Sequence, residues 1–526
     1  MLQHNWLLDA RTKDAACPEF GCAAEDTSRM TRFFSPLRKF RAAICLAVFL
    51  IPTSSILTYA GPIETIQSKI AQFLKRPGMR SADWGIEIFD PTTNNVILSV
   101  NPDKTFQPAS VLKVVTTSTC LEKLGPDFRF RTGVYTNGAI QSDGTLAGDI
   151  ILVGRGDPNL MDPTKELLEK PALEELAESI KVLGIKKIHG NVIGDDSYFE
   201  FTTHGKGWTA QDLKSVYGAP INALSINNNV FWVHVRPTKA NQLVQVSVEP
   251  QTSYFQIRNL GVTGEPHAQR TIYARILPGT TRLVISGVLP ASQGYSQYVL
   301  LERPAEATAT LFKEELRRNG IPADGAVRSN HAGDVSPDAH LSWKLLAEHQ
   351  SPPLIRALEI INKRSLNLHA EMLLRVLGAE LGGAGTDEAG LRVVKNFLES
   401  AGIRDDDKIN LSDGCGLSRD NLVTPRFQTS LLMFLSTRPY FELFLNTLAV
   451  SGTDGTLRNR LSSGPTKGVI HAKTGTLGDV AALSGYMTTK SGHNLIFSIF
   501  ANNVRASIAR VRKTIDEICA LFVNLY

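Results

Sequence analysis

Three short motifs, each supplying polar side chains, restrict what this chain can fold into. They are Ser-x-x-Lys, Ser-x-Asn and Lys-Thr-Gly, formed by Ser110 and Lys113, by Ser365 and Asn367, and by Lys473 to Gly475. Ser-x-Asn also occurs at Ser99, which precedes the first motif, and at Ser225, which lies far from Lys473. Because each motif is weak alone, their order and context carry the weight. The fold must therefore bring the start, the middle and the end of the chain together.

The first motif has the chemistry of a nucleophile and its base. We expect Ser110 at a helix start, where the helix dipole and free backbone N–H groups favour a developing oxyanion. Lys113 at i+3 falls over the same face and can reach the hydroxyl. A lysine base must be neutral, and both burial and a second cation such as Lys473 depress its pKa. The sequence thus predicts Ser110 as acyl-ester nucleophile and Lys113 as general base.

The other two motifs fit substrate binding and proton transfer. Lys473 and Thr474 can hold a substrate carboxylate, and Gly475 allows a close backbone approach on an edge strand. The amide of Thr476 can complete an oxyanion hole with that of Ser110. Ser365 can relay a proton to the leaving amine.

We expect the amide of Asn367 to hold the substrate carbonyl and Lys113. The alternative for Asn367 is a plain helix N-cap. No cofactor or metal is expected, because neither His-Glu-x-x-His nor paired Cys-x-x-Cys is present,.

Composition and the N-terminal region predict an exported globular protein. Of 526 residues 43% are hydrophobic and 20% charged, and the net charge of +5 forms no tract that favours nucleic acid,. We interpret residues 1–29 as an upstream extension and 30–60 as a signal peptide. An apolar run at 42–51 and small residues near Ala60 support that signal, with cleavage before Gly61,. The mature chain would be periplasmic without a stable membrane anchor; the alternative is an uncleaved anchor. Buried free thiols are preferred to a single bridge for Cys120, Cys415 and Cys519.

Hydrophobic periodicity divides the mature chain into three parts. The expected elements are helices at 62–74, 110–124, 163–183 and 507–524, helical patterns over 340–398, and strands at 84–89, 96–100, 469–474, 482–488 and 495–501. A β-rich block at 135–337 separates the first elements from the last. We therefore predict an α/β (α+β) catalytic domain formed by 61–134 and 338–526, split by an insertion at 135–337.

At these motifs the chain resembles the penicillin-binding protein 4 family of D-Ala-D-Ala carboxypeptidase/endopeptidases, peptidase family S13. Further stretches carry the resemblance, at 154–158, 194–199, 217–220, 413–419 and 454–457. It implies a transpeptidase fold like that of penicillin-binding proteins and serine β-lactamases. It also implies hydrolysis of D-Ala-D-Ala termini and D-alanyl cross-links of peptidoglycan stem peptides, with β-lactam antibiotics as covalent inhibitors.

Two details qualify the resemblance. Cys415 stands where the family usually has Ser, which affects positioning near the site. The resemblance also suggests that Asp195 in the insertion recognises the amino group of a diaminopimelate side chain, with Asp196 as a competing match.

Three other functions remain to be weighed. A β-lactamase shares the motifs but lacks the large insertion. A cell-wall scaffold on an inactivated fold conflicts with the intact nucleophile and base. Cys415 as nucleophile lacks a neighbouring histidine signal.

Overall fold

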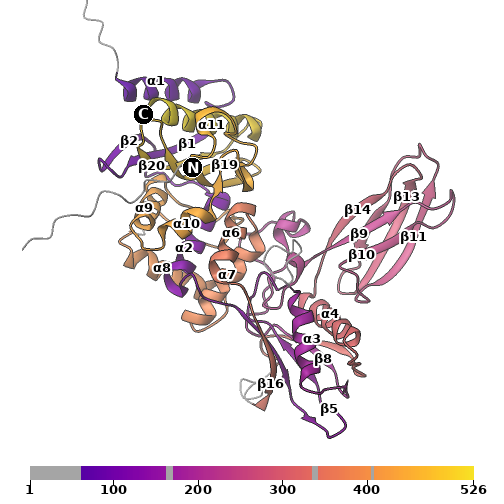
Figure 1. Cartoon of the computed structure of the whole chain (residues 1–526). Helices are drawn as coiled ribbons and strands as arrows, with labels where there is room; N and C mark the ends of the chain where they lie inside the picture. The colour runs from indigo at the N-terminus through magenta and orange to yellow at the C-terminus, as the bar shows by residue number, and fades with distance from the viewer. Residues whose placement is uncertain (1–60, 161–169, 335–341, 404–407) are drawn as a thin grey trace, which may run out of the picture. The chain divides into compact units, whose positions relative to one another are not determined.

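An antiparallel sheet joins the two ends of the described chain. The computed structural model describes residues 61–160, 170–334, 342–403 and 408–526. Within them this sheet has the order β17-β18-β19-β20-β1-β2. Its strands are β1 (Asp83–Asp90), β2 (Asn95–Val100), β17 (Ala449–Val450), β18 (Ile470–Leu477), β19 (Val480–Thr488) and β20 (Asn494–Asn502). β1 pairs with β20 from Asp83 to Phe89, so the first strand of the described chain is hydrogen-bonded to the last (Figure 1). This sheet contains strands from both segments that we assign to the catalytic domain, 61–134 and 338–526.

One face of the sheet packs on the first and last helices, α1 (Pro62–Lys75) and α11 (Ile508–Leu525). Strand alternation places Ile86 and Ile88 in this layer, where both are fully buried,. Ile515 and Ile518 from α11 fill the same core. Burying such a side chain contributes about 1.5–3 kcal/mol, so the packing of the two terminal helices stabilises this face of the sheet.

The other helices outside the insertion carry or surround the three motifs. They are η1 (Ala109–Leu112), α2 (Lys113–Leu124), α6 (Leu354–Arg364), α7 (Asn367–Leu381), α8 (Asp387–Ser400), α9 (Pro425–Ser436) and α10 (Phe441–Thr447). The expected helix at 110–124 is thus a 3-10 turn followed by α2, and nearly all of α2 is buried. Because α2 is buried, the residues at its first turn are held in place.

The insertion begins and ends in one five-stranded sheet of order β15-β8-β6-β3-β16. Its strands are β3 (Arg131–Thr136), β6 (Ile150–Val153), β8 (Val192–Asp195), β15 (Val327–Asn330) and β16 (Lys344–Gln350). The entering strand β3 pairs antiparallel with the leaving strand β16. This sheet therefore reaches beyond the expected limits of 135 and 337 on both sides.

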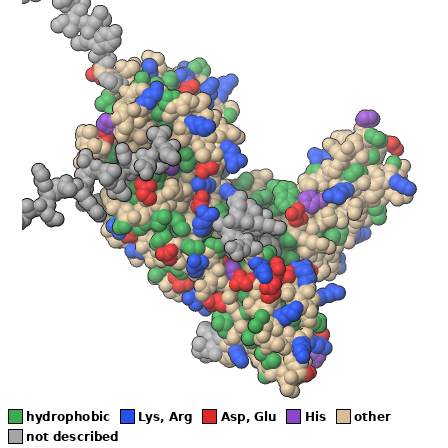
Figure 2. All heavy atoms as spheres, viewed as in Figure 1, with side chains coloured by type: hydrophobic (Ala, Val, Ile, Leu, Met, Phe, Trp, Pro, Cys, Tyr) green, Lys and Arg blue, Asp and Glu red, His purple; other side chains and the backbone are tan. Residues whose placement is uncertain are grey.

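Smaller sheets and two helices complete the insertion. The remaining elements are α3 (Ala172–Val182), α4 (Pro304–Arg318), β4 (Ala139–Ile140), β5 (Thr145–Ala147), β7 (Lys187–Ile188), β9 (Val230–Arg236), β10 (Gln245–Glu249), β11 (Gln256–Gly264), β12 (Tyr273–Ile276), β13 (Arg282–Pro290) and β14 (Tyr295–Leu300). Strands β10-β9-β14 and β11-β13-β12 form two three-stranded sheets, and β4-β5-β7 a third. On the face of the insertion and catalytic part shown in Figure 2, basic and acidic side chains are interspersed.

Two expected helices differ from the structure. The helical pattern predicted from residue 340 is wrong over Lys344–Gln350, which is strand β16, because pairing with β3 overrides the helix-favouring composition,. The helix expected at 163–183 is described from Ala172, after Pro171; residues 163–169 lie outside the described residues.

Other expectations concern the termini and thiols. The upstream extension and signal peptide, 1–60, also lie outside the described residues. Among the residues described, no helix combines the length and apolar character needed to cross a membrane. The preference for buried free thiols holds at Cys120, Cys415 and Cys519.

Candidate active site

Ser110 and Lys113 meet at the junction of η1 and α2. Lys113 Nζ lies 2.9 Å from Ser110 Oγ. The preceding residue, Ala109, has φ 48, in the left-handed region that a non-glycine residue adopts at some energetic cost,. Nine of the 12 residues of α2 are buried, which holds this turn in place. The hydroxyl is thus held at the start of a rigid helix, as the sequence predicts.

Lys113 is surrounded by acceptors in a dry environment. Its side chain is fully buried, and Nζ donates to Asn367 Oδ1 at 2.7 Å and to the carbonyl of Cys415 at 2.8 Å. Burial lowers the pKa of Lys113, and the negative groups around Asp413 and Glu371 offset part of that effect,. A neutral amine has two N–H groups, so two carbonyls occupy them and leave its lone pair for the Ser110 proton.

Asn367 is the first residue of α7 and connects three elements. Its Oδ1 accepts from Lys113, while its Nδ2 donates to the carbonyl of Tyr217 at 2.9 Å. The N-cap of α7 is Leu366, and no side chain caps this helix. The amide therefore acts as a bridge between base and insertion, and the N-cap alternative does not hold.

Ser365 and Lys473 form the second polar pair. Ser365 ends α6 with φ 61 and ψ 42, a left-handed turn that separates α6 from α7. Lys473 Nζ donates to Ser365 Oγ at 2.8 Å and to the carbonyl of Thr474 at 3.0 Å. Burial, together with the charge of Lys113, lowers the pKa of Lys473. Two neighbouring buried amines cannot both stay charged easily, so an arriving carboxylate favours protonation of Lys473.

Strand β18 presents the rest of the third motif. Thr474 Oγ1 donates to Thr456 Oγ1 at 2.9 Å, and Arg512 from α11 donates to Thr476 Oγ1 at 2.7 Å. A Cβ at Gly475 would lie 2.6 Å from the carbonyl oxygen of Pro108. Gly475 is thus required for the close approach of β18 to the nucleophile turn, in addition to the approach of substrate expected from sequence.

The loop after Asp413 supplies the carbonyl that holds Lys113. Asp413 accepts backbone N–H groups from Gly416 at 2.7 Å and Ser418 at 2.6 Å. Glu371 accepts from the N–H of Gly414, and burial raises the pKa of Glu371 to about 8, with Asp413 adding to the shift.

The contact with Lys113 uses the backbone of Cys415, so the Ser-to-Cys difference leaves it in place. Burial raises the pKa of the Cys415 thiol well above its ordinary value, which argues against a nucleophile,. Glu371, Asp413 and Cys415 lie close enough for one metal ion. The backbone amides of Gly414, Gly416 and Ser418 already bind the two carboxylates.

A cavity of about 330 Å³, here called the catalytic cavity, opens at Ser110. Its wall consists of Ser110, Asp212, Tyr217, Ser365, Asn367, Gly416, Leu417, Arg419, Thr476, Leu477 and Gly478. Four of the predicted site residues meet here, and Lys113 and Lys473 contact it through Ser110 and Ser365.

Sequence reasoning missed Asp212, Tyr217 and Arg419, which also line the catalytic cavity. Asp212 lies in a short 3-10 turn of the insertion (η2, Asp212–Lys214), and Tyr217 in the next (η3, Val216–Gly218). Nη1 of Arg419 is buried with no hydrogen-bond partner among the described residues. Tyr217 and Arg419 lie in the stretches 217–220 and 413–419, whose family resemblance was the sequence signal that could have identified them.

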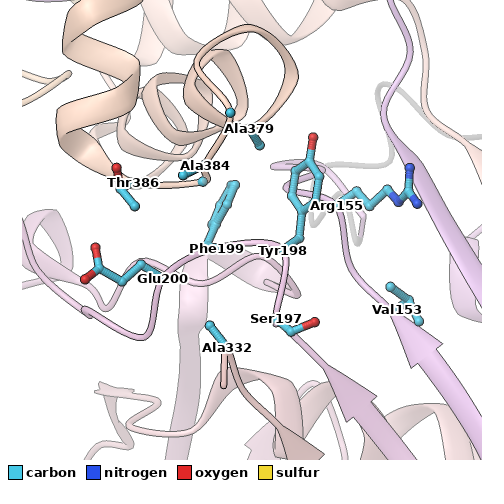
Figure 3. A pocket seen from close by; sticks show the side chains of 12 residues that line it. Val153, Arg155, Ser197, Tyr198, Phe199, Glu200, Ala332, Ala379, Ala384 and Thr386 are labelled. Carbon is cyan, nitrogen blue, oxygen red and sulfur yellow. The ribbon is translucent and has the colours of Figure 1, made fainter. Parts of the chain in front are cut away.

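Asp195 lies elsewhere. It ends β8, is fully buried, and accepts from the N–H and hydroxyl of Ser197 and from Asn330. The chain then runs into a different cavity of about 510 Å³, where Phe199 points toward Ala384 in the α7–α8 turn (Figure 3). Asp196 binds Asn222 and His331. The insertion carboxylate in the catalytic cavity is Asp212, so Asp195 stays a prediction without a contact to this site.

Comparison with known proteins agrees with this geometry. Residues 66–522 match the D-Ala-D-Ala carboxypeptidase 3 (S13) family. The chain belongs to this family. A D-alanyl-D-alanine carboxypeptidase of an Actinomadura species is 32% identical over 486 residues, covering 88% of this chain and 87% of the relative. D-alanyl-D-alanine carboxypeptidase DacB of Haemophilus influenzae is 30% identical over 419 residues, covering 78% and 83%.

Solved structures of S13 proteins show the same fold. Penicillin binding protein 4 of Haemophilus influenzae superposes with a TM-score of 0.73 at 27% identity, covering 87% of this chain and 99% of that one. Its complex with a novel β-lactam superposes with a TM-score of 0.66 at 26% identity, covering 86% and 98%. The mixed α/β fold and the S13 serine carboxypeptidase class of this chain are thus established.

Proposed function

We propose that this S13 chain hydrolyses both D-Ala-D-Ala termini and D-alanyl cross-links of peptidoglycan through an acyl ester on Ser110. The observation that carries the proposal is the environment of Lys113. Its buried amine contacts the carbonyls of Asn367 and Cys415 and lies 2.9 Å from Ser110 Oγ. A neutral amine so placed removes the hydroxyl proton as Oγ attacks the substrate carbonyl.

The remaining steps follow from the neighbouring groups. As the Oγ–C bond forms, the amides of Ser110 and Thr476 stabilise the oxyanion. Ser365, held by Lys473, passes its hydroxyl proton to the leaving nitrogen as the C–N bond breaks. The proton that Lys113 took from Ser110 replaces it on Ser365, which leaves Lys113 neutral again. Lys473 and Thr474 bind the carboxylate of the leaving residue. Water then attacks the ester, and Lys113 takes the water proton and returns it to Ser110.

The acyl side of the substrate would occupy the catalytic cavity. Asp212 and Arg419 line it with opposite charges. Such a pair suits a side chain that ends in both an ammonium and a carboxylate group, as diaminopimelate does. We assign the role expected of Asp195 to Asp212 for this reason. A periplasmic location after signal cleavage completes the proposal.

The test is intact mass of the chain from Gly61 after mixing with benzylpenicillin, followed over time beside Ser110→Ala. We expect a long-lived adduct on the parent protein and none on the variant. Release of D-alanine from a pentapeptide and of monomers from a cross-linked muropeptide dimer would then define the bonds cut. An adduct on Ser110→Ala would refute the assignment, and one lost within seconds would indicate a β-lactamase.

A further inference from the structure

A second cavity of about 600 Å³ borders the residues assigned to the substrate carboxylate. It lies between α6 and the short 3-10 turn η5 (Gly455–Leu457) and is here called the cationic cavity. Two contacts connect it to the catalytic residues. Its wall residue Thr456 accepts the hydrogen bond of Thr474, and its wall residue Arg364 directly precedes Ser365. The cavity therefore adjoins the residues that we assign to the substrate carboxylate.

Basic side chains dominate the wall of the cationic cavity. Its charged wall residues are the basic Arg356, Lys363, Arg364 and Arg458 and the acidic Glu359 and Asp454. Both carboxylates are already engaged. Lys363 contacts Glu359 at 3.1 Å and Asp454 at 2.8 Å, and Arg356 also pairs with Glu359. The cavity thus keeps an excess of positive charge, to which the exposed Arg458 contributes.

The position of this charge relative to the scissile bond decides its use. In the proposed mechanism the acyl half of the substrate lies at Ser110, in the catalytic cavity, and the leaving residue's carboxylate lies at Lys473 and Thr474. The cationic cavity lies beyond Thr474, on the side of Thr456. A leaving D-alanine ends at its carboxylate and does not extend into it. The space is useful only when the leaving amine belongs to a longer molecule.

We propose that the cationic cavity binds the second stem peptide of a cross-linked substrate through the further carboxylates of that peptide. The inference rests on the proposed cleavage of D-alanyl cross-links and assigns the leaving half of that substrate to named residues. Arginine forks suit carboxylates, and such exposed contacts weaken with ionic strength. Cleavage of a cross-linked dimer is accordingly more salt-sensitive than release of D-alanine from a pentapeptide.

The test compares two substrates on matched variants of the full chain. Arg458→Glu reverses one charge in the cationic cavity, at a residue whose side chain is exposed. Arg317→Glu is the control, because Arg317 is also exposed and lies near the end of α4 in the insertion. The probes are a purified D-alanyl cross-linked muropeptide dimer and the corresponding monomeric pentapeptide. Acylation by benzylpenicillin reports the integrity of the catalytic residues.

For Arg458→Glu we expect kcat/KM on the dimer to fall about fivefold or more, mainly through KM, since attraction becomes repulsion. Pentapeptide hydrolysis and penicillin acylation should stay within about twofold, and Arg317→Glu should match the parent on both substrates. Equal losses on dimer and pentapeptide, or no loss on the dimer, would overturn this inference alone. A parent protein that cannot cleave the dimer would overturn the proposed cross-link hydrolysis and this inference with it.

Discussion

The role of Asn367 can be tested by a change of charge at nearly constant shape. Asn367→Asp places a carboxylate where the amide now accepts from Lys113 Nζ at 2.7 Å. The new negative charge favours the ammonium form of Lys113, which cannot act as a base. We therefore expect slow acylation at neutral pH and recovery at higher pH.

The size of the effect follows from the distance. Two unit charges 2.7 Å apart interact by about 6 kcal/mol at an effective dielectric constant of about 20,. Desolvation of the new carboxylate opposes this, and opposite charges at such range raise a lysine pKa by about 1–3 units. One unit is a factor of ten in the neutral fraction. The acylation rate at a pH below the parent pKa of Lys113 should then fall by about 10- to 1,000-fold.

The assay is the rate of benzylpenicillin acylation, measured by intact mass across neutral and alkaline pH. In the parent protein burial lowers the pKa of Lys113, so the rate should rise with pH and level off below the ordinary lysine value of 10.5. Asn367→Asp should move this rising limb to higher pH. Asn367→Ala removes the same contact without adding charge and should lower the rate with no upward shift. Identical limbs in the two variants would refute the reasoning.

Two further changes test the loop that holds Lys113. In Gly416→Ala a Cβ would lie 1.9 Å from the carbonyl oxygen of Ala109 at φ 84, so we expect a loss of about 1–3 kcal/mol in urea unfolding and slower acylation of Ser110,. Gly464→Ala is the control, with φ 61 and open space; equal effects would contradict the contact argument. Glu371 has a pKa of about 8 when folded against an ordinary 4.5, so the folded state retains a proton there and stability falls as pH rises between these values,. Glu371→Gln should abolish this fall, and a stability difference between parent and variant that is the same at about pH 5 and about pH 8 would exclude it.

The contact between the proposed nucleophile and its base could be predicted from the sequence alone. Ser110 and Lys113 are one helical turn apart in any helix, so their contact needed no knowledge of the fold. The hydrogen bond between Ser365 and Lys473 was expected only as proximity within the site. A left-handed turn with φ 61 at Ser365 allows this hydrogen bond, and no glycine at that position indicates the turn in the sequence.

The backbone carbonyls that accept hydrogen bonds from Lys113 and Asn367 could not be predicted from the sequence. Any residue offers the carbonyl that Cys415 gives to Lys113, or that Tyr217 gives to Asn367. Asp212 lacked a signal for the same kind of reason, since its place in the catalytic cavity depends on how the insertion packs. The prediction of a helix over 344–350 failed because pairing with β3, a long-range contact, outweighs the local preference for helix,.

The pairing of β3 with β16 has a consequence for how this enzyme can vary. Phe130 and Ser351, just outside these strands, are hydrogen-bonded to each other, with Ser351 N donating to Phe130 O at 3.0 Å. The chain therefore leaves the acylating half and returns to it at the same point. Segments can be gained, lost or exchanged between those two residues without stretching the path from Ser110 to Lys473. Asp212, the group in the insertion that we propose for recognition of the acyl side chain, can thus change without altering that path.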